Sequence, residues 1–313
     1  MFGSLKKIIV ALVLLIAKEG YLQGNEEALS SAPLTYCPDD CGVFFTEVNA
    51  LYLRAYEGGL FHPCDSTQIT DVNEGSLFVS SLKGKGYEPN FKWSCGFRIG
   101  AGYGFAANNC DIGAYWTHYH SHTKDTNNKN GRKWKINLDV VDVVYRCDCK
   151  MQTCLFLTPF GGLRGASINQ KLFTRFIDTV NGIPATSNGH SKEEFLSIGP
   201  LFGVEGHWLI GCGFSLYSKI SASVLYGTFR IRSNVSNESS TEINNSHLCN
   251  RIHACQPAMD VGFGLEWKKC LCSEMMIIVQ LGLEEHRYFN LNQFCSYGDL
   301  SLDGLSLNIS IEY

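Results

Sequence analysis

Apolar residues recur at every second position over most of the chain, which is the period of a β-strand and not of a helix. In residues 91–105 the odd positions are all apolar or aromatic, whereas the even positions carry glycine, serine and the cations Lys92 and Arg98. The pattern therefore predicts an all-β fold. The expected strands are residues 44–56, 91–105, 112–122, 136–146, 155–166, 196–208, 214–226, 259–267, 277–286 and 305–313.

The length of these segments points to a membrane. Strands of globular proteins usually have about 5–6 residues, whereas a tilted strand needs about 9–11 to cross a bilayer. A membrane barrel turns its apolar face to lipid and its polar face to the lumen. Aromatic residues near the ends of the segments suit that orientation. We therefore expect a closed antiparallel transmembrane β-barrel of about ten strands, with twelve as the alternative.

Short and long connections alternate along the predicted strands. The short ones are residues 106–110, 148–153, 209–213 and 269–273, and the long ones are 57–90, 123–135, 167–194, 233–255 and 290–300. Outer-membrane barrels have short periplasmic turns and longer outward loops, so both termini are expected in the periplasm. The last segment, from Gly304 to Tyr313, alternates and ends in an aromatic residue. We expect the barrel assembly machinery to read it.

The N-terminus predicts secretion. Lys6 and Lys7 precede a ten-residue apolar stretch, residues 8–17, which is too short to span a bilayer. Residues 1–24 are expected to be a signal peptide, with an uncleaved anchor as the alternative. Residues 25–42 would be a periplasmic segment and residues 43–313 the barrel. With 26 Lys and Arg against 30 Asp and Glu, the net charge of −4 argues against a nucleic-acid partner.

Five short motifs, at residues 95–103, 111–117, 158–166, 282–286 and 298–305, carry a family resemblance. The first reads CGFRIGAGY and the third TPFGGLRGA. They resemble the major outer-membrane protein-like family of chlamydia-related bacteria, which is similar to the Legionella major outer-membrane protein family. The resemblance covers most of the chain after about Val43. It implies a pore-forming barrel in the bacterial outer membrane, an envelope stiffened by disulfides, and no catalytic motif or cofactor.

Polar residues opposite the apolar faces are expected to line the lumen, and they are mixed in sign. The function that follows is passive diffusion of small hydrophilic solutes through a porin-like channel. Because small barrels are filled by side chains, a plugged structural or adhesive barrel is the alternative, and a soluble secreted β protein is a third. The lumen-facing candidates are Arg98, Arg164, Glu205, His207, Lys219, Asp260, Glu266, Gln280, Glu284 and His286.

The chain has 14 cysteines, and nine fall at the predicted periplasmic rim. In an oxidising compartment they can pair, so we expect disulfides between neighbouring turns, to other envelope proteins or to a second copy. Free thiols, or a metal bound by the two Cys-x-Cys pairs, are the alternatives. Cys64, Cys249, Cys255 and Cys295 are expected in outward loops and Cys95 on a strand. The nine rim candidates are Cys37, Cys41, Cys110, Cys147, Cys149, Cys154, Cys212, Cys270 and Cys272.

Other possible chemistry is sparse. His118, His120 and His122 share one strand face and could bind a metal, although a solvated rim is the interpretation we prefer. The sequence has no P-loop, HExxH or GxSxG motif. His207 or His286 beside a serine could imitate a hydrolase pair, but serine is abundant. We therefore expect no enzyme, no metal site and no cofactor.

Overall fold

The computed structural model describes residues 42–58, 89–105, 109–126, 131–180, 183–238, 243–272, 275–293 and 298–313. The predicted signal peptide, the segment before Gly42, Cys37, Cys41, Cys64, Cys295 and the side chain of Cys272 lie outside this description. Among the described residues, no helix is long and apolar enough to cross a membrane.

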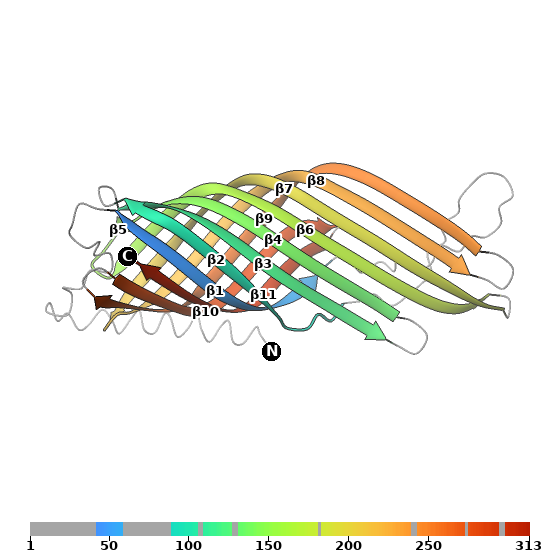
Figure 1. Ribbon diagram of the computed structural model, residues 1–313, viewed down its shortest axis with the longest axis horizontal. Coiled ribbons are helices and arrows are strands. Elements are labelled where there is room, and N and C mark those ends of the chain that lie inside the picture. The colour runs from blue at the N-terminus through green and yellow to red at the C-terminus, as the bar shows by residue number, and fades with distance from the viewer. Residues whose placement is uncertain are drawn as a thin grey trace. The chain divides into compact units, whose positions relative to one another are not determined.

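Ten long antiparallel strands and one two-residue strand form a single sheet, which closes because β4 pairs with β6 (Figure 1). The predicted closed barrel of ten strands is therefore confirmed, with the short β5 added beside β6. The strands are β1 (Val43–Glu57), β2 (Ser94–Phe105), β3 (Cys110–Thr126), β4 (Gly131–Cys147), β5 (Cys149–Lys150), β6 (Leu155–Val180), β7 (Ile183–Gly211), β8 (Phe214–Glu238), β9 (Ile243–Cys272), β10 (Met275–Asn292) and β11 (Gly298–Glu312).

An apolar belt surrounds the outside of the barrel. On β2 the exposed residues are the apolar odd positions of the sequence pattern, such as Phe97 and Ile99. On β11 the exposed face carries Leu307 and Ile309, while the intervening serine and asparagine side chains are buried. Because no second layer of described residues covers these side chains, the belt has the orientation that a lipid-facing surface requires.

Beyond the belt the polarity of the two faces is reversed. On β4 the outward residues change from Val141 and Val143 to Lys135 and Lys133, while the buried inward residues become Trp134 and Ile136. The physical reason is that these strands outrun the apolar belt, so water replaces lipid on the outside. An apolar interior then replaces the polar one.

This reversal corrects three expected loops. The expected loop 123–135 is much shorter, because β3 continues to Thr126 and β4 begins at Gly131. Residues 167–194 and 233–255 are not long connections, because β6 continues to Val180 before β7 begins at Ile183, and β8 continues to Glu238 before β9 begins at Ile243. The strand period persists there, but the apolar positions move from one face to the other. Cys249 and Cys255, expected in an outward loop, consequently lie on the exposed face of β9.

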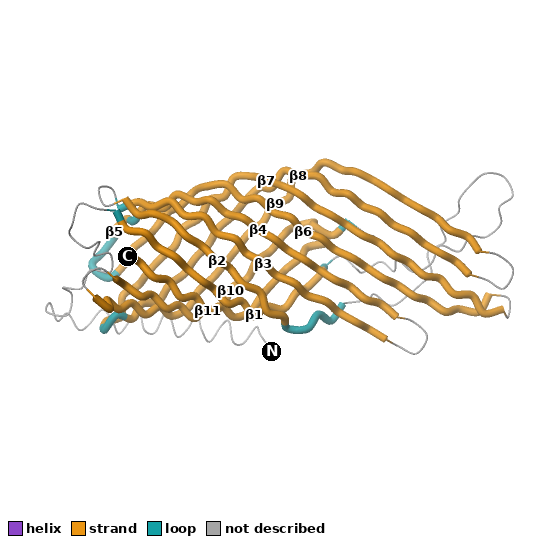
Figure 2. Tube along the Cα trace, in the orientation of Figure 1, coloured by secondary structure: helices purple, strands orange, loops and turns teal. Residues whose placement is uncertain are grey.

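We call the end of the barrel that carries the tight turns the turn end, and the opposite end the far end (Figure 2). At the turn end Gly211, Cys212 and Gly213 join β7 to β8, all with positive φ. The beginning of β1 and the residue after β11 also meet there, because the backbones of Phe44 and Tyr313 exchange two hydrogen bonds of 2.9 Å.

Candidate functional site

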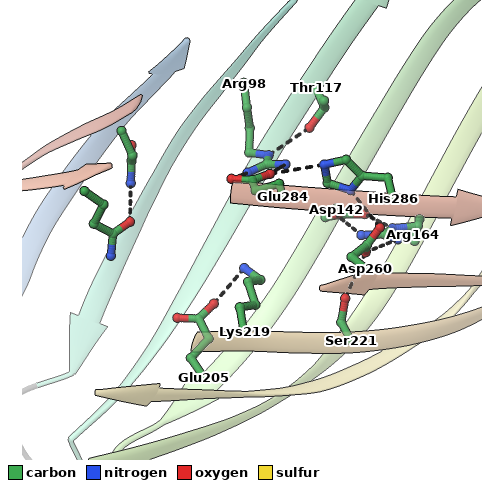
Figure 3. A network of polar contacts seen from close by, with 12 residues as sticks. Arg98, Thr117, Asp142, Arg164, Glu205, Lys219, Ser221, Asp260, Glu284 and His286 are labelled. Atoms are coloured by element: carbon green, nitrogen blue, oxygen red, sulfur yellow. Dashed lines mark hydrogen bonds and ion pairs between the residues drawn. The ribbon is translucent and has the colours of Figure 1, made fainter. Parts of the chain in front are cut away.

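All ten candidates for lumen-facing polar residues lie on inward positions of their strands. Eight of them belong to two polar clusters, and the other two form the Lys219–Glu205 ion pair; Figure 3 shows the cluster around Arg164 and this ion pair. They meet there because β2, β6, β7, β8, β9 and β10 face one another across the narrow lumen. We call the two clusters the central network and the turn-side network. Arg98, Arg164, Asp260, Glu284 and His286 belong to the first, and His207, Glu266 and Gln280 to the second.

Arg164 is the centre of the central network. Its Nε and Nη2 donate to the two carboxylate oxygens of Asp142 on the neighbouring β4, at 2.7 and 2.8 Å. Its Nη1 donates at 2.7 Å to Asp260 on β9, which lies across the lumen. Paired, bidentate geometry of this kind is the strongest that a guanidinium offers. The Arg164 side chain is only 8% exposed, so this bridge closes part of the lumen cross-section.

Asp260 connects Arg164 to the rest of the central network. Its other oxygen pairs with His286 Nδ1 at 2.8 Å, and His286 Nε2 lies 3.1 Å from Glu284. Glu284 in turn accepts from Arg98 Nη2 at 3.0 Å. The resulting chain of alternating charges runs from β6 through β9 and β10 to β2. Each buried charge in this chain has an oppositely charged neighbour, and this attraction offsets the free-energy cost of removing the charge from water.

The turn-side network is centred on Glu266 of β9. Its carboxylate accepts from Ser215 at 2.8 Å and from Gln280 at 2.7 Å, and it pairs with His207 and Lys268 at 3.2 Å each. Between the two networks, Lys219 and Glu205 form their own ion pair at 2.6 Å.

Sequence reasoning missed several partners in these networks. Asp142 and Arg146 lie on inward positions of β4, where Arg146 pairs with Asp111 of β3 at 2.8 Å. A signal was present, because both residues alternate with the outward Val141, Val143 and Tyr145. The alternation of β4 is interrupted by the inward Val144 and changes polarity at Val140, which obscured the assignment of faces.

An apolar layer lines the lumen on the far side of the central network. It was not expected from the sequence, since Trp134 fell in a predicted loop. Phe195 and Phe229 stack with ring centroids 4.2 Å apart, and Trp134 Nε1 donates at 2.9 Å to Gln170. Nine of the ten long strands contribute. The apolar layer comprises Leu51, Leu53, Ala55, Phe91, Tyr119, Trp134, Ile136, Leu138, Val140, Ala166, Ile168, Phe195, Leu225, Phe229, Ile231, Ala258, Tyr288, Leu291, Leu300 and Leu302.

The cysteines at the turn end behave in two ways. Cys110 of β3 and Cys147 of β4 are directly opposed in the sheet and form a disulfide. The prediction of a rim disulfide is confirmed for this pair. Cys149, Cys154, Cys212 and Cys270 carry free thiols in this single chain, and for them a link to another envelope protein or to a second copy stays a prediction. Strand pairing explains the difference, because it brings Cys110 and Cys147 to within 4.1 Å between Cα atoms.

The three histidines of β3 lie outside the barrel and not in the lumen. His118 Nδ1 pairs with Asp139 at 2.8 Å, and His120 Nδ1 is hydrogen-bonded to Asn137. Within the described part of the chain, no three His, Cys, Asp or Glu side chains gather as a metal site requires. The hydroxyls of Ser215 and Ser221 donate to carboxylates, at 2.8 Å each, and not to an imidazole.

Several solved structures are similar to this chain over most of its length, each at low identity. The outer membrane protease OmpT from Escherichia coli is 8% identical, with 88% of this chain and 99% of that chain covered and a TM-score of 0.45. The attachment invasion locus protein Ail of Yersinia pestis, in complex with the heparin analogue sucrose octasulfate, is 12% identical, with 87% and 99% covered and a TM-score of 0.26. A Pseudomonas aeruginosa FadL homologue is 7% identical, with 91% and 93% covered and a TM-score of 0.23.

No curated protein sequence matches this chain. The sequence pattern of one protein family does match, over residues 36–312, which includes every strand of the barrel. That family is described as the Legionella pneumophila major outer membrane protein precursor. The match supports the Legionella part of the resemblance seen in the sequence motifs. The chain is an outer-membrane β-barrel that belongs to the Legionella major outer membrane protein family.

Proposed function

We propose that this protein is a closed structural barrel of the outer membrane and not an open diffusion channel. The observation that carries the proposal is the apolar layer, in which Trp134, Phe195 and Phe229 are each at most 1% exposed. A side chain bordering a water-filled pore would be touched by solvent. Almost complete burial on so many strands is what a filled lumen produces.

The central network supports the same conclusion from the other side of the apolar layer. Arg164 spans from Asp142 to Asp260, and the Arg98–Glu284 ion pair connects β2 to β10. An ion crossing this region would have to separate charges that compensate one another. Ten strands also lie near the lower end of the barrel sizes, where side chains fill the interior.

Because a closed barrel passes no solute through its lumen, we place its function at its two ends. The turn end is expected in the periplasm, since short turns occupy that side in outer-membrane barrels. The Cys110–Cys147 disulfide fixes two strands there. We include in the proposal that free rim thiols such as Cys149 and Cys212 link the barrel to other envelope proteins or to a second copy. We propose no catalytic role.

Conductance in planar bilayers tests the closed lumen. The full chain, refolded with its disulfide intact, is expected to give no stepwise current. The variant F195A/F229A removes the stacked pair from the apolar layer and is expected to conduct, because two facing cavities open there. The matched control is F202A/F214A, which removes two exposed, lipid-facing phenylalanines and is expected to stay silent. Stable current steps from the unmodified protein would refute the proposal.

Diffusion of small hydrophilic solutes is the second candidate function. The observation that favours it is the polar inner face of the turn-side half, where Glu266, His207 and Lys219 are placed. Its test is the same experiment, with current steps from the unmodified protein as the expected outcome.

Three further expectations remain proposals for this chain. The signal peptide over residues 1–24 would bring it to the periplasm, and the segment from Gly304 to Tyr313 would present it to the barrel assembly machinery. Its origin in the chlamydia-related branch remains a prediction from the motifs at residues 95–103 and 282–286.

A further inference from the structure

A row of cations crosses the outer surface of four adjacent strands near the far end. In the sheet register Lys135 of β4 faces Lys171 of β6, Lys171 faces Lys192 of β7, and Lys192 faces Arg232 of β8. All four occupy outward positions, since the residues beside them in sequence, such as Ile136, Glu193 and Ile231, are buried. We call these four residues the cationic row.

The neighbouring outward positions add three cations, Arg230, Arg251 and Lys133, against two carboxylates among the described residues. Arg230 of β8 faces Arg251 of β9, and both are exposed. Among the described outward residues close to the row, Glu194 is bound to Lys192 and Asp139 is bound to His118. These carboxylates therefore already have cationic or imidazole partners.

The charge is confined to one side of the barrel. On the opposite side, the outward row across β10, β11 and β1 consists of Glu285, Asp303 and Arg54. That row mixes signs, as an ordinary solvated surface does. The cationic row consequently gives the far half of the barrel a positive side and a mixed side.

Like charges directly opposite each other destabilise a sheet. With strands about 4.8 Å apart, the four cations extend over roughly 15 Å and each is within a few ångströms of its neighbour. A surface with only a structural role would have no need for four cations on adjacent strands. An extended array of anionic groups would relieve the repulsion by binding Lys135, Lys171 and Arg232 together, whereas Lys192 already pairs with Glu194.

The position of the row indicates which anions these are. On β7 the last exposed apolar residue is Leu196, four residues from Lys192, and on β8 it is Tyr226, six residues from Arg232. At about 3.4 Å per residue and a tilt of about 45°, the row is roughly 10–14 Å beyond the apolar edge. Lysine and arginine stems reach back along a surface toward the headgroup layer.

We propose that the cationic row binds the phosphate groups of lipid headgroups in the leaflet at the far end of the barrel. Each phosphate accepts charge-assisted hydrogen bonds from two adjacent side chains of the row, and the acyl chains of the same lipid pack on the apolar belt below. The lipid class follows from the chemistry: a headgroup with more than one phosphate, bound on the β4–β8 side. This inference is independent of whether the lumen is open.

Binding of diphosphorylated lipid A to the full chain in detergent micelles tests the proposal, with monophosphorylated lipid A and phosphatidylcholine as comparison probes. The test variant is K135Q/K171Q/R232Q, which keeps the Lys192–Glu194 pair. The matched control is K92Q/K150Q/K269Q, which removes three exposed cations away from the row. Heat-modifiable mobility in gels establishes that both variants fold.

We expect the unmodified protein to prefer two phosphates over one and over none, with affinity falling as salt is raised. Each basic residue near an anionic surface strengthens binding by about fivefold, so the test variant should bind on the order of 100-fold more weakly. The control should bind like the unmodified protein. Equal binding by the test variant, equal loss in the control, or saturation of the row by soluble heparin in preference to lipid A would overturn the proposal.

Discussion

Removing the Arg164 side chain is the sharpest perturbation of the lumen. In R164M the hydrophobic stem is retained while the guanidinium is lost, so Asp142 loses both of its hydrogen bonds from Arg164 and Asp260 loses one. Asp260 keeps Ser221 and His286 as partners at 2.8 Å each. Breaking a buried ion pair by deleting one partner costs about 3–5 kcal/mol.

We expect the lower end of that range, about 3 kcal/mol, because Asp260 remains partly satisfied and Asp142 is 15% exposed. That corresponds to about a 100-fold change in the unfolding equilibrium constant. The measurement is reversible urea unfolding in lipid vesicles, followed by tryptophan fluorescence, with heat-modifiable gel mobility as a second readout.

Two further variants separate the ion pair from general damage. K92M removes an exposed cation just before β2, away from the lumen and from the cationic row, and should leave the urea midpoint nearly unchanged. D142N/R164M should recover part of the loss, because a neutral amide is less costly to leave without its partner than a carboxylate. If R164M unfolded at the same urea concentration as the unmodified protein and K92M, the central network would not be a stabilising element and the reasoning would fail.

Three other predictions use different parts of the barrel. C110S/C147S should lower the free energy of unfolding by about 3–4 kcal/mol in the loop-entropy model for the sequence separation of 37. Reductant should have the same effect on the unmodified protein. An unchanged urea midpoint in either case would contradict this prediction. G199A should destabilise by roughly 1–3 kcal/mol, because a Cβ there would lie 1.9 Å from the Val224 carbonyl oxygen, whereas G165A, with 3.9 Å of clearance, should not. A membrane-impermeant maleimide on intact cells should label Cys249 and reach Cys212 only after the outer membrane is permeabilised; the reverse order would place the turns outside.

The strand period explains how much of the fold could be predicted. Two-residue alternation tells which residues share a face, as it did for Phe97 and Ile99 on β2 and for Leu307 and Ile309 on β11. The excess length of the strands then selected a bilayer over a second protein layer. The same reasoning placed Arg164, Glu284 and His286 on one side of their strands, opposite the apolar belt.

The period does not reveal where a strand ends when its surroundings change. Residues 167–194 and 233–255 keep the alternation, but the apolar positions move inward once water replaces lipid outside. For that reason Phe195, Phe229 and Ile231 were not recognised as inward residues of the apolar layer. A sequence search for this change of phase within one run would have found them.

The sequence by itself determined the local periodicity, which side chains share a face and the membrane as the solvent of the belt, because these depend only on neighbours along a strand. The tertiary structure alone decided which faces meet. Closure through β4 and β6 brings Arg98 to Glu284, 186 residues away, and Arg164 to Asp260, 96 residues away. It also aligns Lys135, Lys171, Lys192 and Arg232 in one row. Register and closure are properties of the whole sheet, so no single strand encodes them.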